Sequence, residues 1–399
     1  MHDVRAGAEQ GSKKGKGGGM GAPIRILVVV GTRPEAIKLA PVIRRLRADH
    51  RFALTVCATG QHRGLLDDAL AAFGVKPDID LDLMMPDQRP AVLAARVLQA
   101  LDGLLAQRRF DWMLVQGDTV TTLAAAEAAF YARVPLAHVE AGLRSGDLRQ
   151  PFPEEGQRAM VARIAELHFA PTEEARGNLL AEGIDWRRIH VTGNTGIDAL
   201  LTMAEAVRGS DACDRDDVDG ALRQERGADM RRRLLLVTAH RRENLGDGLA
   251  RICVALRRLA ERTDIEIVWP LHPNPAVGKA VPPLLGAHPR IRLIAPPDYR
   301  AFVRLLLEAE IVLTDSGGLQ EEAPALGRPV LVLRDVTERP EAVAAGAARL
   351  VGTDPDRILG EAMRLLDDPA AYAAMARPRL IFGDGNAAER IVKVLAGGE

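Results

Sequence analysis

Residues 24–50, IRILVVVGTRPEAIKLAPVIRRLRADH, combine an apolar run of strand type, a glycine turn at Gly31 and apolar positions that then recur at helical spacing. The same succession returns at residues 52–73, 111–134 and 167–183. It resumes with the apolar runs RLLLVTA (233–239), IEIVWPL (265–271), IRLIA (291–295), IVLTD (311–315), RPVLVL (328–333) and ARLVG (348–352). Strands that alternate with helices predict parallel sheets with helices on both faces, an α/β fold.

The alternation stops between residues 198 and 230, where the stretch SDACDRDDVDG (210–220) is polar and acidic. A chain of 399 residues is also longer than a single core of roughly 250–300 residues. We therefore predict two Rossmann-like, doubly wound parallel-sheet domains. Their expected boundaries are residues 1–22 for a flexible tail (with Met20 as an alternative start), 23–197 and 198–380 for the domains, and 381–399 for a C-terminal helix that can pack back on the first domain.

The composition excludes several classes of protein. Hydrophobic residues make up 47% and charged residues 27% of the chain, and the net charge is −1, so we expect neither disorder nor a nucleic-acid partner. Cys57, Cys213 and Cys253 form no CxxC pair, which predicts a reducing compartment, the cytoplasm. No apolar run approaches the roughly 20 residues of a membrane span, and the N-terminus has no apolar core of a secretion signal.

Two loops that follow predicted strands suit an anionic ligand. At residues 31–35 a glycine turn leads into a helix whose free N–H groups, with Arg33 and Lys38, would make an anion site. At Ser316, Gly317 and Gly318 a second such turn would let a diphosphate approach the backbone closely. An ordinary helix start and an ordinary cap remain the alternatives. Neither loop is GxGxxG, so nothing indicates NAD.

Carboxylates occupy the corresponding places in the first half of the chain. Asp118 follows the strand WMLVQ, Glu140 ends the next one, and Glu154 or Glu155 comes after a loop. We expect them to converge at one edge, where mutual repulsion would raise the pKa of at least one. A lone Asp after a strand is often only a helix cap. In the second half, Glu321 and Glu322 are suited to sugar hydroxyls.

Histidines follow two strands of the second half. His240 precedes Arg241 and Arg242, which predicts a site for a phosphate-bearing anion. His272 follows its strand in the same way, with a weaker indication of function. No spacing of His, Cys and Asp matches a zinc site, so we expect no metal.

Taken together, the chain from about residue 25 to residue 394 resembles the non-hydrolysing UDP-N-acetylglucosamine (UDP-GlcNAc) 2-epimerase family. The motifs that carry the resemblance are GTRPEAIKLAPVI (31–43), TGQHRGLLDDAL (59–70), VQGDT (115–119), HVEAGLRSGD (138–147), PFPEEGQR (151–158), VTGNTGIDAL (191–200), TAHRREN (238–244), LHPNP (271–275), LTDSGGLQEEAPALGRPVLVLRDVTERPEA (313–342) and GDGNAAERI (383–391). Gly196 stands where an apolar residue is commoner, and Pro297 where a polar residue near the base is common.

The resemblance implies roles for individual residues. The reaction-centre residues would be Asp118, Glu140, Glu154 and His240. The residues that bind the nucleotide diphosphate or ribose would be Arg33, Lys38, Ser316, Glu322 and Arg339, with Gly317 and Gly318 in the turn and Phe302 beside the uracil. Gln61 and His62 match part of a second, regulatory UDP-GlcNAc site. The resemblance also implies a glycosyltransferase-B type pair of domains facing across a cleft, a homodimer, and no cofactor.

The implied activity is reversible conversion of UDP-GlcNAc to UDP-N-acetylmannosamine (UDP-ManNAc), through loss of UDP and its return, which would supply ManNAc for a cell-surface polysaccharide. The alternatives are a hydrolysing epimerase that releases ManNAc and UDP, a transferase of the same fold, and an inactive sensor of nucleotide sugars. The motif TGQHR (59–63) with the paired acids argues against the first two alternatives, and retention of every candidate acid and of His240 argues against the sensor.

Overall fold

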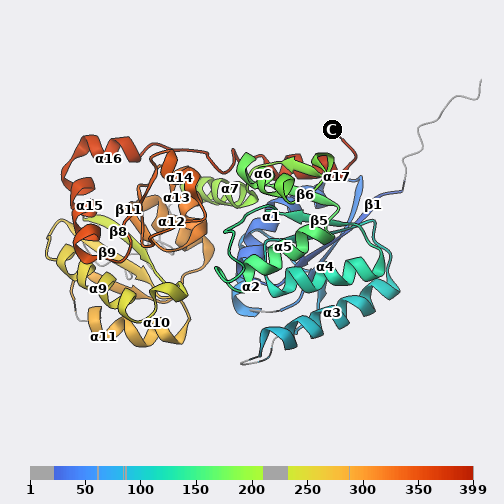
Figure 1. Cartoon of the computed structure of the whole chain (residues 1–399), viewed down its shortest axis with the longest axis horizontal. Coiled ribbons are helices and arrows are strands. Elements are labelled where there is room, and N and C mark those ends of the chain that lie inside the picture. Colours follow the sequence, from blue (N-terminus) through green and yellow to red (C-terminus); the bar gives the residue numbers. More distant parts are fainter. Residues whose placement is uncertain are drawn as a thin grey trace, which may run out of the picture.

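The computed structural model describes residues 22–60, 63–83, 85, 88–209, 232–286 and 288–398. They form two α/β halves that lie side by side (Figure 1). The predicted Gln61 and His62 lie outside the described residues.

The first half contains a seven-stranded sheet in the order β3-β2-β1-β4-β5-β6-β7. Neighbouring strands pair in parallel. The strands are β1 (Ile24–Val30), β2 (Phe52–Ala58), β3 (Ile79–Asp80), β4 (Trp112–Gln116), β5 (Leu136–Val139), β6 (Leu167–Ala170) and β7 (Ile189–Val191). The helices are α1 (Arg33–Ala48), α2 (Arg63–Ala72), α3 (Pro90–Gln107), α4 (Val120–Ala132), α5 (Glu154–Ile164), α6 (Glu173–Ala181) and α7 (Thr195–Gly209), with a 3-10 turn, η1 (Trp186–Arg188).

The second half repeats the plan with a six-stranded parallel sheet in the order β10-β9-β8-β11-β12-β13. The strands are β8 (Arg233–Thr238), β9 (Ile265–Pro270), β10 (Ile291–Ile294), β11 (Ala309–Thr314), β12 (Val330–Val332) and β13 (Ala348–Leu350). The helices are α9 (Asp247–Leu259), α10 (Pro275–Ala280), α11 (Pro282–Leu285), α12 (Tyr299–Glu308), α13 (Gly317–Ala325), α14 (Pro340–Ala344), α15 (Pro355–Asp367), α16 (Pro369–Met375) and α17 (Ala387–Leu395), with η2 (Arg242–Asn244).

The central strands are apolar without alternation because both sheet faces are covered. Residues 26–30 of β1 are buried throughout, with even-numbered side chains in one core cluster and odd-numbered ones in another. The same holds for β8 and β9 in the second half. This burial on both faces is the physical reason that continuous apolar runs predicted parallel sheets. The prediction of two Rossmann-like domains is confirmed.

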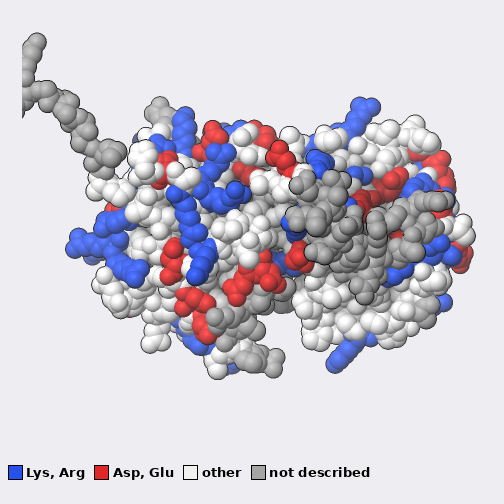
Figure 2. Space-filling view, turned by 180° about the vertical axis from the view of Figure 1, so that it is seen from behind, with Lys and Arg blue, Asp and Glu red and all other residues white. Residues whose placement is uncertain are grey.

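Two segments connect the halves. Helix α7 packs on α1 of the first half and on α12 and α13 of the second, so the boundary predicted after residue 197 falls inside one continuous helix. After α16 the chain crosses back, and α17 packs on α1 and α7 (Figure 1). Viewed from behind, the surface is indented between the halves, and basic residues are interspersed with acidic ones (Figure 2).

Candidate active site

In both sheets the strand order reverses beside the first strand of the half, between β1 and β4 and between β8 and β11. Ligands of open parallel sheets bind at the carboxyl ends of the strands at such a point. Arg33 and Asp118 follow β1 and β4, while His240 and Asp315 follow β8 and β11. The predicted site residues therefore lie where the fold places a ligand.

The loops of the two halves meet each other directly. Nη2 of Arg33 donates a 3.1 Å hydrogen bond to the carbonyl oxygen of Pro297. Nη2 of Arg339, from the second half, lies 3.9 Å from Oε1 of Glu140, from the first. Residues separated by much of the chain thus line one interdomain site.

Glu140 occupies the first residue after β5 in a left-handed backbone conformation, with φ of 63°. This conformation is costly for a residue with a side chain and is found most often at functional sites. The buried carboxylate accepts hydrogen bonds from Nζ of Lys38 at 2.7 and 2.6 Å and from the amide of Gln116. Its position is therefore set by the backbone and by α1 and β4 together.

The charges around Glu140 keep it ionised. Burial opposes ionisation, but Lys38 and Arg339 outweigh burial and lower the pKa of Glu140. Burial likewise opposes the charge of Lys38, and the Glu140 carboxylate more than compensates and raises the pKa of Lys38. The expectation that mutual repulsion raises the pKa of a carboxylate is not met at Glu140, because Lys38 and Arg339 lower its pKa by more than burial raises it.

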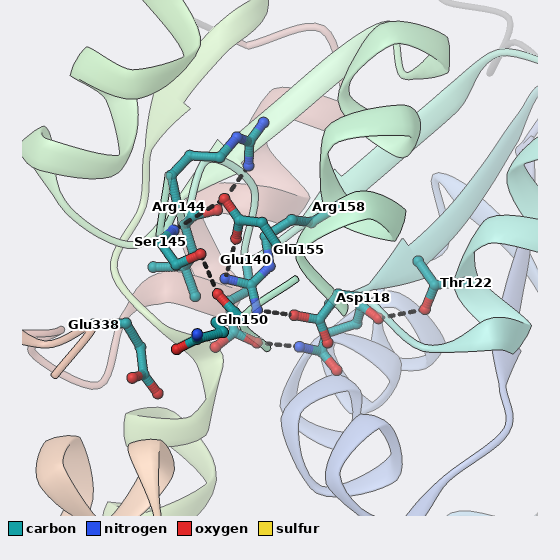
Figure 3. Close-up of polar contacts among 12 residues, drawn as sticks. Asp118, Thr122, Glu140, Arg144, Ser145, Gln150, Glu155, Arg158 and Glu338 are labelled. Atoms are coloured by element: carbon teal, nitrogen blue, oxygen red, sulfur yellow. Dashed lines mark hydrogen bonds and ion pairs between the residues drawn. The ribbon is translucent and has the colours of Figure 1, made fainter. Parts of the chain in front are cut away.

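Asp118 is held by an arginine that the sequence analysis did not single out. Arg158 of α5 donates a short hydrogen bond to Asp118 and lies 3.3 Å from Oε2 of Glu155 (Figure 3). Glu155 in turn accepts from the backbone N–H groups of Ser145 and Gly146 at 2.9 and 3.1 Å. Glu155 therefore shapes the loop after Glu140 and orients Arg158.

Glu154, the first residue of α5, differs from its neighbour. Oε2 of both acids is buried without a hydrogen-bond partner among the described residues, but Oε2 of Glu155 lies in an ion pair 3.3 Å from Nη1 of Arg158, whereas Glu154 has no ion pair among these residues. A buried, unpartnered carboxylate oxygen is costly unless a ligand or a proton satisfies it. Of the two acids that the sequence left open, Glu154 has an oxygen available for a ligand, whereas Glu155 is engaged in structure.

His240 is placed by the carboxylate of Asp315. Oδ2 of Asp315 accepts from the backbone N–H groups of His240 and Arg241, both at 2.8 Å. Nδ1 of His240 lies 3.6 Å from Oδ1, and its ring stacks on that of His272 with centroids 4.5 Å apart. Burial lowers the pKa of His240, partly offset by Asp315. The structure thus brings both predicted histidines together.

The Gly-rich turn after β11 approaches another loop closely. A Cβ at Gly317 would lie 2.7 Å from Oε1 of Glu338, whereas at Gly318 the nearest atom would be 3.9 Å away. Burial opposes the charge of Glu338, but Arg339, Arg334 and Arg241 lower its pKa to about 2. The turn therefore lies beside an ionised carboxylate and several guanidinium groups.

Arg339 is buried, and its guanidinium Nε donates to Oε1 of Glu321 at 2.5 Å. Glu321 is also buried, and it accepts hydrogen bonds from Arg339 and from Asn194. Glu322 follows Glu321 in α13. Burial, together with the negative charges of Glu321 and Glu140, raises the pKa of Glu322 to about 7, although Lys38 and Arg33 oppose this rise. Phe302 is partly buried on α12, which packs against α7.

One prediction about the turn after β1 is wrong. The backbone N–H groups of Gly31 and Thr32 are not free for an anion, because Oε2 of Glu35 accepts from them at 2.5 and 2.9 Å. Gly31 is required for a different reason. A Cβ there would lie 2.2 Å from Oγ1 of Thr121 and 2.8 Å from Oγ1 of Thr59. The N–H groups of Gly31 and Thr32 are therefore used within the turn, and the role of Arg33 at an anion stays a prediction.

The described part of the chain contains no group of three His, Cys, Asp or Glu side chains placed to hold a metal ion. Over the same residues, no helix has the length and apolarity that crossing a membrane requires.

A sequence model of the UDP-N-acetylglucosamine 2-epimerase family matches residues 44–396. This chain belongs to the UDP-N-acetylglucosamine 2-epimerase family. It is 49% identical over 378 residues to the UDP-N-acetylglucosamine 2-epimerase of Escherichia coli K12 and 47% identical over 373 residues to that of Salmonella typhimurium. Each comparison covers 93% of this chain and 98% of the relative.

Solved structures of the 2-epimerase family share the fold. The Neisseria meningitidis UDP-GlcNAc 2-epimerase bound to UDP-GlcNAc is 42% identical, with a TM-score of 0.89 over 94% of this chain and 100% of that one. The Methanocaldococcus jannaschii UDP-GlcNAc 2-epimerase in complex with UDP-GlcNAc and UDP is 32% identical, with a TM-score of 0.82 and the same coverage. The family resemblance stated from the motifs is confirmed.

Within this 2-epimerase, three site residues escaped the sequence reasoning: Arg158, Asn194 and Glu321 as an interdomain contact. The spacing of Arg158, four residues after Glu154 and three after Glu155, places it on their face of α5 and is a signal that could have found it. Asn194 follows β7, another strand exit. The partner of Glu321 lies 127 residues away and leaves no local signal.

Proposed function

We propose that this 2-epimerase interconverts UDP-GlcNAc and UDP-ManNAc without releasing free sugar. The observation that carries the proposal is that the loops at the carboxyl ends of the strands of one half meet the corresponding loops of the other half. Asp118, Glu140 and Glu154 lie in the first half, and the His240 and Ser316 loops in the second, with Arg339 reaching to 3.9 Å from Glu140. The named activities of the relatives support this reading.

The proposed chemistry starts with departure of UDP. The hydrogen at C2 of the sugar is only weakly acidic, and positive character at C1 acidifies it as the C1–O bond breaks. A carboxylate takes the C2 proton, the C1–O electron pair leaves with UDP, and 2-acetamidoglucal remains. A carboxyl group then protonates the opposite face of C2 while the UDP oxygen re-forms the bond to C1. Asp118, Glu140 and Glu154 are proposed to supply the acid and base.

The departing diphosphate needs cationic and hydrogen-bonding groups. We propose Arg33, Lys38, Arg339 and His240 for this role, together with the Ser316, Gly317 and Gly318 turn. Glu322 would contact the ribose and Phe302 the uracil. Closure of the two halves would exclude water and retain the glycal. Binding of UDP to the isolated protein, measured by calorimetry, tests these groups.

Proton NMR of the protein with UDP-GlcNAc in deuterated water separates the alternatives. UDP-ManNAc with deuterium at C2 and no accumulating free sugar is the expected result. Free ManNAc with UDP would instead establish a hydrolysing epimerase. Absence of turnover, with UDP-sugar still bound, would favour a transferase that lacks its acceptor or a sensor.

A homodimer is the proposed assembly. Phe130 and Tyr131, at the end of α4, are 64% and 69% exposed, and their ring centroids lie 5.9 Å apart. Exposed aromatic side chains that lie together favour a protein interface. Light scattering coupled to size exclusion should give twice the mass of 43.1 kDa, and a single chain mass would contradict the proposal.

Regulation, location and pathway are further proposals. Gln61 and His62 would take part in a second UDP-GlcNAc site, and a sigmoidal dependence of rate on UDP-GlcNAc would test it.

Unpaired, buried Cys57 and Cys253 support a reducing, cytoplasmic location. The product would serve a cell-surface polysaccharide, and the composition of that polymer after loss of the protein tests this.

A further inference from the structure

Asn194 lies where both interdomain connections meet. It precedes α7, and its backbone N–H donates a 2.6 Å hydrogen bond to the carbonyl of Phe382, in the segment that crosses back toward α17. Its neighbour Gly193 is so close to this segment that a Cβ would lie 3.1 Å from the Cα of Gly383. The side chain of Asn194 is 2% exposed. The buried Asn194 is therefore in contact with both connections between the halves.

The orientation of the amide follows from its partners. Oδ1 of Asn194 accepts from the backbone N–H of Gly196 at 2.9 Å. The NH₂ group therefore faces two carboxylates, Oε1 of Glu140 at 3.2 Å and Oε2 of Glu321 at 2.5 Å. Glu140 belongs to the first half of the chain and Glu321 to the second. One neutral group thus donates to a carboxylate of each half.

Gly196 leaves room for this arrangement. A Cβ at Gly196 would lie 3.2 Å from Oδ1 of Asn194 and 3.5 Å from Cγ of Lys38. The glycine that departs from the commoner apolar residue therefore adjoins both the amide and the cation that binds Glu140.

The surrounding charges are balanced in number. Lys38 binds Glu140, and Arg339 binds Glu321 while lying 3.9 Å from Glu140. Buried carboxylates are stable only when cations and hydrogen-bond donors compensate for lost water. The two N–H donors of Asn194 satisfy an oxygen on each carboxylate at the place where the carboxylates approach one another.

We propose that Asn194 is a positioning residue that acts through Glu140, and that its bond to Glu321 makes the orientation of Glu140 depend on docking of the second half. This inference rests on the proposed epimerase function and deepens it. When the halves separate, Glu321 leaves, and the amide can turn away from Glu140. Chemistry is then confined to the closed form, in which the glycal cannot escape.

Other groups also face Glu140 and contribute to its titration. They come from α1, α5, the strand β5 itself and the second half: Lys38, Arg158, His138, Arg339, Glu321 and Glu322. Burial lowers the pKa of His138 to about 4, so this ring is neutral over the working range. These side chains stay the same in variants of Asn194, so a pH displacement between variants reports the loss of the amide from Glu140 and from Glu321.

The experiment compares Asn194→Ala and Asn194→Asp with wild type by following C2 deuteration of UDP-GlcNAc as a function of pH. Asn194→Ala removes both donors, so kcat should fall on the order of 10²-fold with a much smaller change in KM. The pH optimum should rise, because Glu140 loses a donor that favours its ionised form. Asn194→Asp should displace the optimum to lower pH, because its carboxyl group can donate only while protonated.

Asn386→Ala is the matched control, since Asn386 is an exposed asparagine of the same crossing segment, and its kinetics should equal those of wild type. Circular dichroism and thermal melting confirm that each variant folds. Because Asn194 and Glu321 act together, the double variant Asn194→Ala with Glu321→Gln should be no slower than the slower single variant.

The outcomes distinguish the two levels of proposal. Wild-type protein that deuterates nothing at C2 would overturn the epimerase function and this inference with it. An active wild type, with pH optima displaced in opposite directions in the two Asn194 variants, supports the inference. An active wild type, with variants that lose the same activity at every pH or lose none, overturns the positioning role alone.

Discussion

At the scale of single residues, Glu140 shows how several weak constraints define one carboxylate. Its left-handed backbone turns the side chain away from the strand, with φ of 63°. Lys38, Gln116 and Asn194 then satisfy its oxygens, so burial does not neutralise it. Removing one of these partners leaves the buried charge of Glu140 incompletely compensated. The resulting loss in the free energy of unfolding is larger than the net contribution of the partner itself.

Lys38→Met is expected to destabilise the fold because Glu140 stays buried without its closest cation. Breaking a buried ion pair on one side costs roughly 3–5 kcal/mol, which should be visible as a lower midpoint in urea unfolding. Lys393→Met, at an exposed lysine of α17, should change stability by about 0.5 kcal/mol or less. Equal stability of Lys38→Met and wild type would show that Glu140 takes up a proton at little cost.

Glu322 is expected to make stability pH-dependent. Its folded pKa of about 7 lies above the ordinary value of 4.5. The folded state thus holds a proton that the unfolded state releases between these values. Stability from this group is present below pH 4.5 and is lost as pH rises through 7. Glu322→Gln should therefore be more stable than wild type at pH 8, by roughly 3 kcal/mol at most.

Urea unfolding of both proteins at pH 5 and pH 8 checks this. The stability difference between Glu322→Gln and wild type should grow from pH 5 to pH 8. A difference independent of pH would mean that Glu322 is ionised in the folded protein throughout.

At the scale of elements, the turn that begins α13 contains two adjacent glycines with different surroundings. A Cβ at Gly317 would require the side chain of Glu338 to shift, whereas a Cβ at Gly318 would make only ordinary contacts, with its nearest atoms 3.9 Å away. Adjacent glycines of one turn therefore have different reasons for being glycine. The distinction belongs to the packing of α13 against the loop before α14, not to the turn itself.

Gly317→Ala should lower the free energy of unfolding by about 1–3 kcal/mol because Glu338 and its arginine partners must shift. Gly318→Ala, at a helical position with free space, should stabilise the helix by roughly 0.5–1 kcal/mol. Thermal melting of the two ligand-free variants gives the comparison. The reverse order of melting temperatures would contradict the close approach at Gly317.

At the scale of the whole molecule, the C-terminal helix α17 packs against α1 and α7, near the beginning and the end of the first half. Both oxygens of Asp198, in α7, accept from the first N–H groups of α17, at 3.2 Å from Ala387 and 2.8 Å from Ala388. Ile391, Val392 and Leu395 then bury in the core cluster that contains α1 and α7 together with residues of the second half. The last residues of the chain thus stabilise the first half, and the crossing segment limits how the halves can move.

Asp198→Ala should cost about 1–2 kcal/mol, the usual loss for removal of a helix cap. Hydrogen exchange should become faster in α17 in particular. Asp356→Ala removes an acid whose ion pair with Arg258 is exposed, and its cost should be at most about 1 kcal/mol. Unchanged exchange in α17 after Asp198→Ala would show that its apolar face alone holds the helix.

The sequence by itself determined the α/β class, the parallel strands, the strand-exit loops and, through its motifs, the family. These features depend on local periodicity and on residues that are close along the chain. The turn after β1 shows the limit: the pattern predicted free N–H groups, and a side chain four residues on from Gly31 occupies them. Only the folded structure shows that a side chain of the protein, and not a ligand, accepts hydrogen bonds from these N–H groups.

Tertiary structure alone decided the charge of Glu140 and the difference between Glu154 and Glu155. It also decided the link from Asn194 to Glu321, across 127 residues. The pKa of a buried acid depends on the few groups within several ångströms, whatever their distance in sequence. The motifs placed the carboxylates at one sheet edge. The groups that set their chemistry come from α1, β4 and α5 of the first half and, through Arg339, from the docking of the second half.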